Sequence, residues 1–296
     1  MPRAMSIHIG INDDGRRVVL NDSETAAWQM AGLAWQAGYG SILVLRGQEA
    51  TRGAVHAALA GASQALREGD SLFVSFSGHG GQEPDHDGDD GGFDESWCLY
   101  DGPLLDDKLA GYWRLFDAGV RIVVVSESCF AGGLGRTGHG HAPGPVSPDA
   151  PRRMRGGLSY RDEPSWAKAA VAKVMASCVV EPPQDSREIR ASVLMLTASA
   201  EHQPARGGLF TRCLLEAWGK DGFDGSYCAL YKDVRQRVMN ANPRQEPHVL
   251  MLGTPDPDFL ELPAFRLDRT PGPPRDKTIY RGPVHLTNDR EASREV

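Results

Sequence analysis

Two apolar stretches, each ending in glycine, constrain the fold of this chain most strongly. Leu72–Ser77 runs into Gly78-His79-Gly80, and Arg121–Glu127 runs into Ser128-Cys129 and the small residues that follow it. Continuous apolar runs of this length are typical of strands buried on both faces of a parallel sheet. Ligands of such sheets collect at the carboxyl ends of the strands, where we expect His79 and Cys129 to lie close together. A cysteine with a histidine in reach forms a nucleophile and its base.

The rest of the chain predicts an α/β domain. Apolar strands are expected at 6–11, 41–45, 192–198 and 248–253, and amphipathic helices at 23–37, 51–67, 208–218 and 226–240. A further helix is expected to open at Asp101-Gly102-Pro103, because proline suits a first helical turn. This alternation favours a mostly parallel sheet of about six strands with helices on both faces.

One domain is expected to span residues 1–268. Inside it, residues 131–165 are rich in Gly, Pro, Arg and His and predict a long mobile loop, followed by a short helix at 164–177. The tail at 269–296 is expected to be disordered.

Composition excludes several classes of protein. The 296 residues are 41% hydrophobic and 24% charged, as in ordinary globular domains, and no apolar run approaches the ~20 residues that span a bilayer. The net charge of −7 argues against nucleic acid and anionic membranes as partners. Five cysteines are too few for a disulfide framework, and no apolar signal region follows Met1. We therefore expect a cytoplasmic protein, and a monomer.

Several sequence blocks carry a resemblance to a known family. They are Ser77-Gly78-His79-Gly80-Gly81-Gln82, Phe93-Asp94-Glu95-Ser96-Trp97-Cys98-Leu99-Tyr100-Asp101-Gly102, Ser126-Glu127-Ser128-Cys129-Phe130-Ala131-Gly132, and Thr197–Gln203 with Gly208–Thr211. Over roughly residues 5–267 the chain resembles the caspase-like cysteine peptidases of the C14 family, most closely their bacterial metacaspase branch, also called orthocaspases. Cys129 follows His79 by 50 residues, which matches the spacing known for caspases. The resemblance implies a caspase-like three-layer sandwich.

The resemblance also implies a reaction. Cys129 would attack the peptide carbonyl, His79 would transfer protons, and an acyl-thioester would then be hydrolysed. The backbone N–H groups of Gly80 and Cys129 would hold the oxyanion, and no cofactor is needed for the chemistry. The substrates would be proteins or peptides.

Glu127 is the candidate for recognising a basic substrate residue. It lies two residues before Cys129, and in a strand this spacing puts both side chains on one face. Metacaspases resemble the chain here but carry Asp, which implies cleavage after Arg or Lys. Their second pocket acid aligns with Ala26, so Asp22 and Glu24 are the nearby acids that could replace it, although their position favours capping of the helix.

A calcium site is implied by resemblance only. The acidic stretch Asp85–Glu95 does not have the spacing of an EF-hand loop. Metacaspases have an activating calcium site whose acids match Asp94, Asp106 and Asp107, while Arg136 stands where the fourth acid is expected. Asp106 and Asp107 would also suit the amino end of a helix electrostatically.

Two other functions remain open at this point. The departures at the specificity pocket, beside an intact Cys–His pair, fit a catalytically silent caspase-like scaffold that responds to calcium or binds proteins. A cysteine-dependent amidase on the same fold is the third interpretation. Exposed arginines in 131–165 favour either a solvated loop or a self-cleavage segment.

Overall fold

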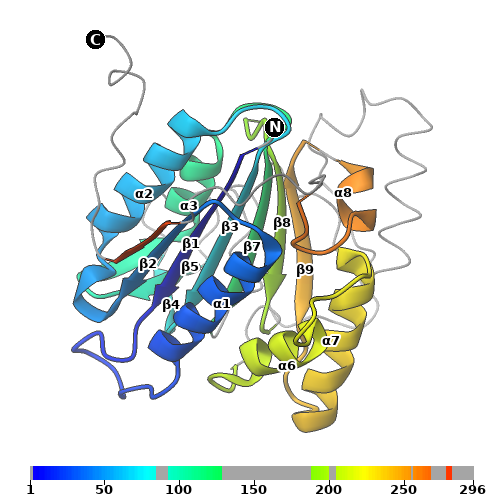
Figure 1. Ribbon diagram of the computed structural model, residues 1–296. Coiled ribbons are helices and arrows are strands. Elements are labelled where there is room, and N and C mark those ends of the chain that lie inside the picture. Colours follow the sequence, from blue (N-terminus) through cyan, green and yellow to red (C-terminus); the bar gives the residue numbers. More distant parts are fainter. Residues whose placement is uncertain are drawn as a thin grey trace, which may run out of the picture.

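The computed structural model describes residues 3–84, 93–128, 188–199, 205–254, 256–267 and 278–281. Its main feature is a twisted sheet with helices packed against both faces (Figure 1). This is the mostly parallel three-layer arrangement that the sequence predicts. The predicted loop at 131–165 and helix at 164–177 lie outside the described residues.

The main sheet has seven strands in the order β10-β2-β1-β3-β7-β8-β9. Every neighbouring pair is parallel except β8 and β9, which are antiparallel. The strands are β1 (Ala4–Gly10), β2 (Ser41–Arg46), β3 (Ser71–Ser77), β7 (Arg121–Glu127), β8 (Ser192–Thr197), β9 (His248–Gly253) and β10 (Thr278–Arg281).

Two apolar cores lie on the two faces of this sheet. Alternate residues of the central strands, such as Val123 and Val125, face a core shared with α1, α6 and α7, while Ile122 and Val124 face a core shared with α2 and α3. Figure 1 shows α1 crossing in front of the sheet. The helices are α1 (Ser23–Ala37), α2 (Arg52–Ala65), α3 (Asp106–Trp113), α6 (Leu209–Trp218), α7 (Tyr227–Ala241) and α8 (Pro257–Glu261), with a short 3₁₀ turn η1 (Gly47–Glu49).

The register of β3 and β7 fixes the geometry of the site edge. Ser77, the last residue of β3, lies opposite Glu127, the last residue of β7. The amide of Gly78 then donates to the carbonyl oxygen of Glu127 at 3.2 Å. Both strands therefore end at the same level.

A second, three-stranded antiparallel sheet was not expected. It is formed by β4 (Gly80–Pro84), β5 (Phe93–Leu99) and β6 (Gly102–Leu105), in the order β4-β5-β6. The helix expected to open at Asp101-Gly102-Pro103 is a wrong prediction, since α3 starts only at Asp106. Gly102 has φ +142°, which favours glycine, and Pro103 lies on an edge strand, where its missing N–H costs little.

The carboxyl-terminal segment also differs from expectation in one place. Thr278–Arg281 form β10, which pairs in parallel with β2 at the edge of the sheet. The disorder expected for 269–296 therefore does not hold for these residues. The remainder of that segment lies outside the described residues.

His8 in the central strand β1 makes stability depend on pH. It is fully buried, with Nδ1 2.8 Å from Ser75 Oγ and its ring edge-on to Phe73. Burial lowers its pKa from 6.5 to about 3. As the pH falls from 6.5 towards 3, the unfolded chain binds a proton that the folded chain does not. The free energy of unfolding should then fall by up to about 1.4 kcal/mol per pH unit.

We expect His8→Gln to remove this part of the pH dependence. The check is urea unfolding at several pH values between 6 and 4, comparing the slope of the unfolding free energy in wild type and variant. His56→Gln is the matched control, because His56 is exposed on α2. Equal slopes for wild type and His8→Gln would contradict the assignment.

Candidate active site

His79 follows the carboxyl end of β3 and is half-buried. Its Nε2 lies 2.7 Å from the backbone carbonyl oxygen of Val18. Because a carbonyl oxygen only accepts hydrogen bonds, Nε2 must carry the hydrogen. In the neutral ring Nδ1 is then the atom with a free lone pair, and it is the atom that can take a proton from a thiol.

The segment 11–20 that supplies this carbonyl is held at both ends and in the middle. The amide of Ile11 donates to the carbonyl of Ser77 at 3.0 Å. Asp14, whose side chain is 1% exposed, accepts from the backbone amides of Arg16 and Arg17 and from the Arg17 guanidinium at 2.6 Å. Burial acts to raise the pKa of Asp14, but these hydrogen bonds and the charge of Arg17 outweigh it and lower the pKa. The segment is thus a fixed support for His79.

Trp97 of β5 joins the small sheet to the end of β7. Its indole stacks on Phe76 with ring centroids 4.7 Å apart, and its Nε1 donates to Ser126 Oγ at 3.0 Å. Ser126 Oγ is in turn 3.3 Å from Ser128 Oγ. β4 begins at Gly80, directly after His79, and the end of β7 precedes Cys129. This buried chain of contacts therefore fixes the two segments that flank the expected dyad.

Cys129, the predicted nucleophile, lies just outside the described residues. The described part ends at Ser128, which is 2% exposed and whose carbonyl accepts from Ser199 Oγ at 3.4 Å. The register of β3 and β7 brings the residues before His79 and before Cys129 side by side. Gly80, the predicted oxyanion donor, directly follows His79 as the first residue of β4.

Glu127 is buried, with 3% of its surface exposed, against the amino end of α6. Its Oε1 accepts from the amides of Phe210 at 2.8 Å and Thr211 at 3.3 Å, while Oε2 is buried with no hydrogen-bond partner among the described residues. Burial raises its pKa, the nearby charge of Asp22 adds to this, and the hydrogen bonds from Thr211 and Phe210 oppose it.

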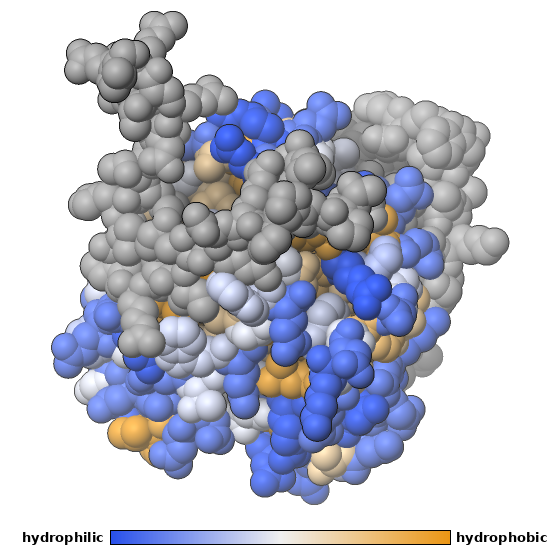
Figure 2. All heavy atoms as spheres, viewed as in Figure 1, coloured by the Kyte–Doolittle hydropathy of each residue, from blue (hydrophilic) through white to orange (hydrophobic). Residues whose placement is uncertain are grey.

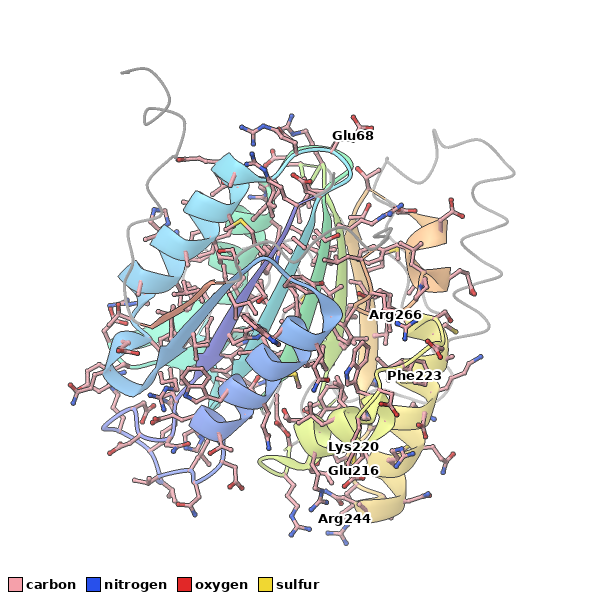
Figure 3. The ribbon with its side chains drawn as sticks, in the orientation of Figure 1. Glu68, Glu216, Lys220, Phe223, Arg244 and Arg266 are labelled. Atoms are coloured by element: carbon pink, nitrogen blue, oxygen red, sulfur yellow. The ribbon has the colours of Figure 1, made fainter. Side chains whose placement is uncertain are left out.

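An open cavity of about 600 Å³ lies between α1 and α6. Asp22 and Ala26 line it from the α1 side, and Thr211 and Glu216 from α6. Glu216 is labelled on α6 in Figure 3. Asp22 precedes α1, and its side chain makes no capping hydrogen bond. Its carboxylate lies close to Gly208, since a Cβ built on that glycine would be 3.4 Å from Asp22 Oδ2. The carboxyl groups of Asp22 and Glu127 therefore both lie near the start of α6.

The other predicted site residues are less closely grouped. Glu24 faces β2, where its Oε2 lies 3.9 Å from Arg46 Nη1, and it is not among the residues that line this cavity. Asp106 is 5% exposed and accepts from the amide of Asp107 at 2.9 Å, at the amino end of α3. Asp94 lies in β5, and its side chain is outside the described part.

The described side chains, which do not include that of Asp94, give no support of their own for a calcium site. Among the described side chains no group of three or more His, Cys, Asp or Glu residues is placed to hold a metal ion. A hard cation such as Ca²⁺ needs six or more oxygen ligands, roughly, and Asp106 with Asp107 falls well short of that.

Three contributors to the site were missed from the sequence. Val18 acts through its backbone carbonyl, which any residue could supply, so no sequence signal could identify it. Ser126 is a polar residue in an apolar strand, and its side chain is on the face of the strand that contacts Trp97. A polar residue in such a run indicates a buried hydrogen bond, and this was the signal that the sequence offered. The amides of α6 are anonymous in the sequence, so the hydrogen bonds to Glu127 could not be read from it.

Comparisons with known proteins bear on the fold and the family of this chain. The sheet order and the helices on both faces define a mostly parallel, three-layer α/β protein. Residues 6–135 match the family model described as "Metacaspase, peptidase C14 domain", so this part of the chain is similar to that family.

Named relatives match over short stretches. Metacaspase-1 of Coccidioides immitis is 44% identical over 72 residues, which is 22% of this chain and 16% of that protein. Metacaspase-7 of Arabidopsis thaliana is 42% identical over 71 residues, 23% of this chain and 18% of that protein. The matched part of the chain therefore spans less than a fifth of the length of either relative.

A solved structure matches over most of the chain. The crystal structure of a Geobacter sulfurreducens protein is 28% identical and superposes with a TM-score of 0.66, covering 90% of this chain and 99% of that one. Most of the chain, including much of the part beyond residue 135, therefore has a counterpart in that structure. In the described residues, no helix has the length and apolar character needed to cross a membrane.

Proposed function

We propose that this protein is a cysteine endopeptidase that uses Cys129 and His79 and cleaves after Arg or Lys. The observation that carries the proposal is the common level at which β3 and β7 end, with Ser77 opposite Glu127. Two residues beyond each of these positions stand His79 and Cys129. The match of residues 6–135 to the metacaspase model of the C14 family supports the coarser statement that the site is that of a cysteine peptidase.

The proposed reaction assigns each proton to an atom. His79 holds a hydrogen at Nε2 against the Val18 carbonyl, so Nδ1 accepts the thiol proton of Cys129. The thiolate adds to the peptide carbonyl, and the amides of Gly80 and Cys129 stabilise the oxyanion. His79 Nδ1 then protonates the leaving amine, and water hydrolyses the thioester with the same nitrogen as base.

The preference for a basic residue rests on Glu127 and Asp22. Both carboxyl groups are near the start of α6, and Asp22 is exposed to the cavity. A guanidinium in this cavity would meet the Asp22 carboxylate directly, while the carboxyl group of Glu127, which is buried at the start of α6 and does not line the cavity, would act on it through its charge. Proteins or peptides containing exposed Arg or Lys are the proposed substrates, in the cytoplasm, with the enzyme as a monomer.

Calcium activation is kept as a separate proposal from the family resemblance. It assigns Asp94, Asp106 and Asp107 to the ion, while the described side chains give no independent support for a site. The test below therefore includes calcium as one arm.

The decisive test is a fluorogenic Arg-peptide assay of wild type and Cys129→Ala, each with added calcium and with chelator. We expect turnover by wild type and at least a 10³-fold loss in the variant, roughly, as for other enzymes that lose their nucleophile. Intact-mass measurement of the same samples reports self-cleavage and its position. Activity that is equal in calcium and in chelator would reject the calcium proposal alone.

The two competing functions predict different results in the same assay. No turnover of basic or acidic peptide libraries by wild type would overturn the peptidase and favour a silent scaffold. Turnover of small amides with no cleavage of longer peptides would favour an amidase.

A further inference from the structure

Val18 and Val19 are two adjacent apolar side chains exposed at the site edge. They are 82% and 54% exposed, the highest values among the large hydrophobic residues in the described part of the chain. Figure 2 shows apolar surface at the lower left of the molecule, in the region of the segment that follows β1 in Figure 1. Scattered exposed apolar residues are ordinary, so exposure alone would mean little.

What distinguishes this pair is its fixed position beside His79. The Val18 carbonyl accepts from His79 Nε2 at 2.7 Å, so Val18 lies across a single imidazole ring from Nδ1. The buried Asp14 and the Arg17 guanidinium, 2.6 Å apart, hold the segment, and Arg17 rests on Gly81 of β4. The two valines are therefore presented by a braced segment at a set distance from the reacting nitrogen.

The chemistry of the reaction says which part of a substrate comes here. His79 Nδ1 must protonate the leaving amine, so the substrate residues that follow the scissile bond lie on the histidine side. An extended peptide advances about 3.4 Å per residue, so its first two residues after the bond cross the ring and reach the valines.

We propose that Val18 and Val19 form a subsite for an apolar side chain in the first two residues after the scissile bond. This inference rests on the proposed function and adds a specificity on the leaving-group side. Covering the valines with an apolar side chain removes apolar surface from water on both partners, at roughly 25 cal/mol per Å². Glu127, at the end of β7, and Asp22, just before α1, would select the residue before the bond.

The test uses three peptides that are identical up to an Arg and continue with Leu-Leu, Ser-Ser or Asp-Asp. For wild type we expect kcat/KM for Leu-Leu to exceed that for Ser-Ser by about tenfold. In the double variant Val18→Thr, Val19→Thr the ratio should fall to about two, because each threonine keeps the branched shape and the backbone carbonyl but replaces a methyl by a hydroxyl. Leu115→Thr is the control, since Leu115 is 46% exposed two residues beyond the end of α3, and it should keep the wild-type ratio.

The possible failures are distinguishable. Labelling of Cys129 by an Arg-based inactivator that has no residue after the reactive carbonyl reports the peptidase alone. If wild type is labelled and cleaves all three peptides equally, the subsite is overturned and the proposed function stands. A preference for Asp-Asp would also overturn it, because it would assign this position to an arginine such as Arg16. If wild type is neither labelled nor active on any peptide, the proposed function itself fails.

Discussion

Replacing His79 by alanine is expected to lower kcat/KM on Arg-peptides by about 10²–10⁴-fold, the usual contribution of a general acid–base group. The variant loses Nδ1, the atom that the Val18 hydrogen bond leaves free to take a proton. The fold should be retained, because His79 is half-buried and lies beyond the last residue of β3. The loss should therefore appear in kcat, while the midpoint of urea unfolding stays close to that of wild type.

Two comparisons sharpen this experiment. His56→Ala removes an exposed imidazole on α2 and should keep full turnover. His79→Gln can still donate to the Val18 carbonyl but has no base to offer, so it should be as inactive as the alanine variant. Normal turnover by His79→Gln would show that the ring does not act as the proton carrier.

Replacing Glu127 by glutamine is expected to reduce the preference for Arg-peptides over uncharged ones by about 100-fold, equivalent to about 2.7 kcal/mol. Glutamine keeps an oxygen for the amides of Phe210 and Thr211, so α6 keeps its hydrogen bonds. It removes only the charge that would face a guanidinium. The measurement is kcat/KM for peptides that differ only in the residue before the scissile bond.

Stability separates the two roles of Glu127. The folded-state pKa of this acid is raised, so its ionisation opposes folding and the stability it contributes is lost as the pH rises through that value. At neutral pH, Glu127→Gln should thus be at least as stable as wild type. Glu127→Ala leaves two amides without their acceptor and should be less stable by about 2 kcal/mol.

A distant glutamate provides the control for Glu127. Glu68, labelled far from α6 in Figure 3, is exposed, and Glu68→Gln should keep both stability and preference. Unchanged Arg preference in Glu127→Gln would show that the pocket assignment is wrong, whatever the stability result.

The fold was predictable wherever burial left a clear pattern. The run Arg121–Glu127 is apolar because helices cover both faces of β7, and the periodic helix at 23–37 has the same bounds in the structure. The sheet β4-β5-β6 was missed because its outer strands, β4 and β6, are short and contain Gly and Pro. Pro103 was interpreted as opening a helix, although an edge strand tolerates it equally well.

The candidate site was predictable only for residues whose side-chain type and position in the sequence indicate a chemical role. His79 and Glu127 could be named because a polar residue at the end of an apolar strand is a strong local signal. The sequence could not show which of Asp22 and Glu24 belongs to the pocket. The answer depends on the direction of each carboxylate at the start of α1: Asp22 lines the cavity, and Glu24 faces Arg46. Backbone groups such as the Val18 carbonyl carry no sequence signal at all.

Glu127 both accepts hydrogen bonds from α6 and is proposed to recognise the substrate, and this combination affects how such a pocket can evolve. An acid whose one oxygen secures a helix cannot be exchanged for a neutral apolar residue without a folding penalty, so selection on substrate choice is coupled there to selection on stability. Asp22 caps nothing with its side chain and is exposed. Drift in substrate preference among descendants of this chain should therefore accumulate first at position 22, with position 127 changing only after α6 has acquired another support.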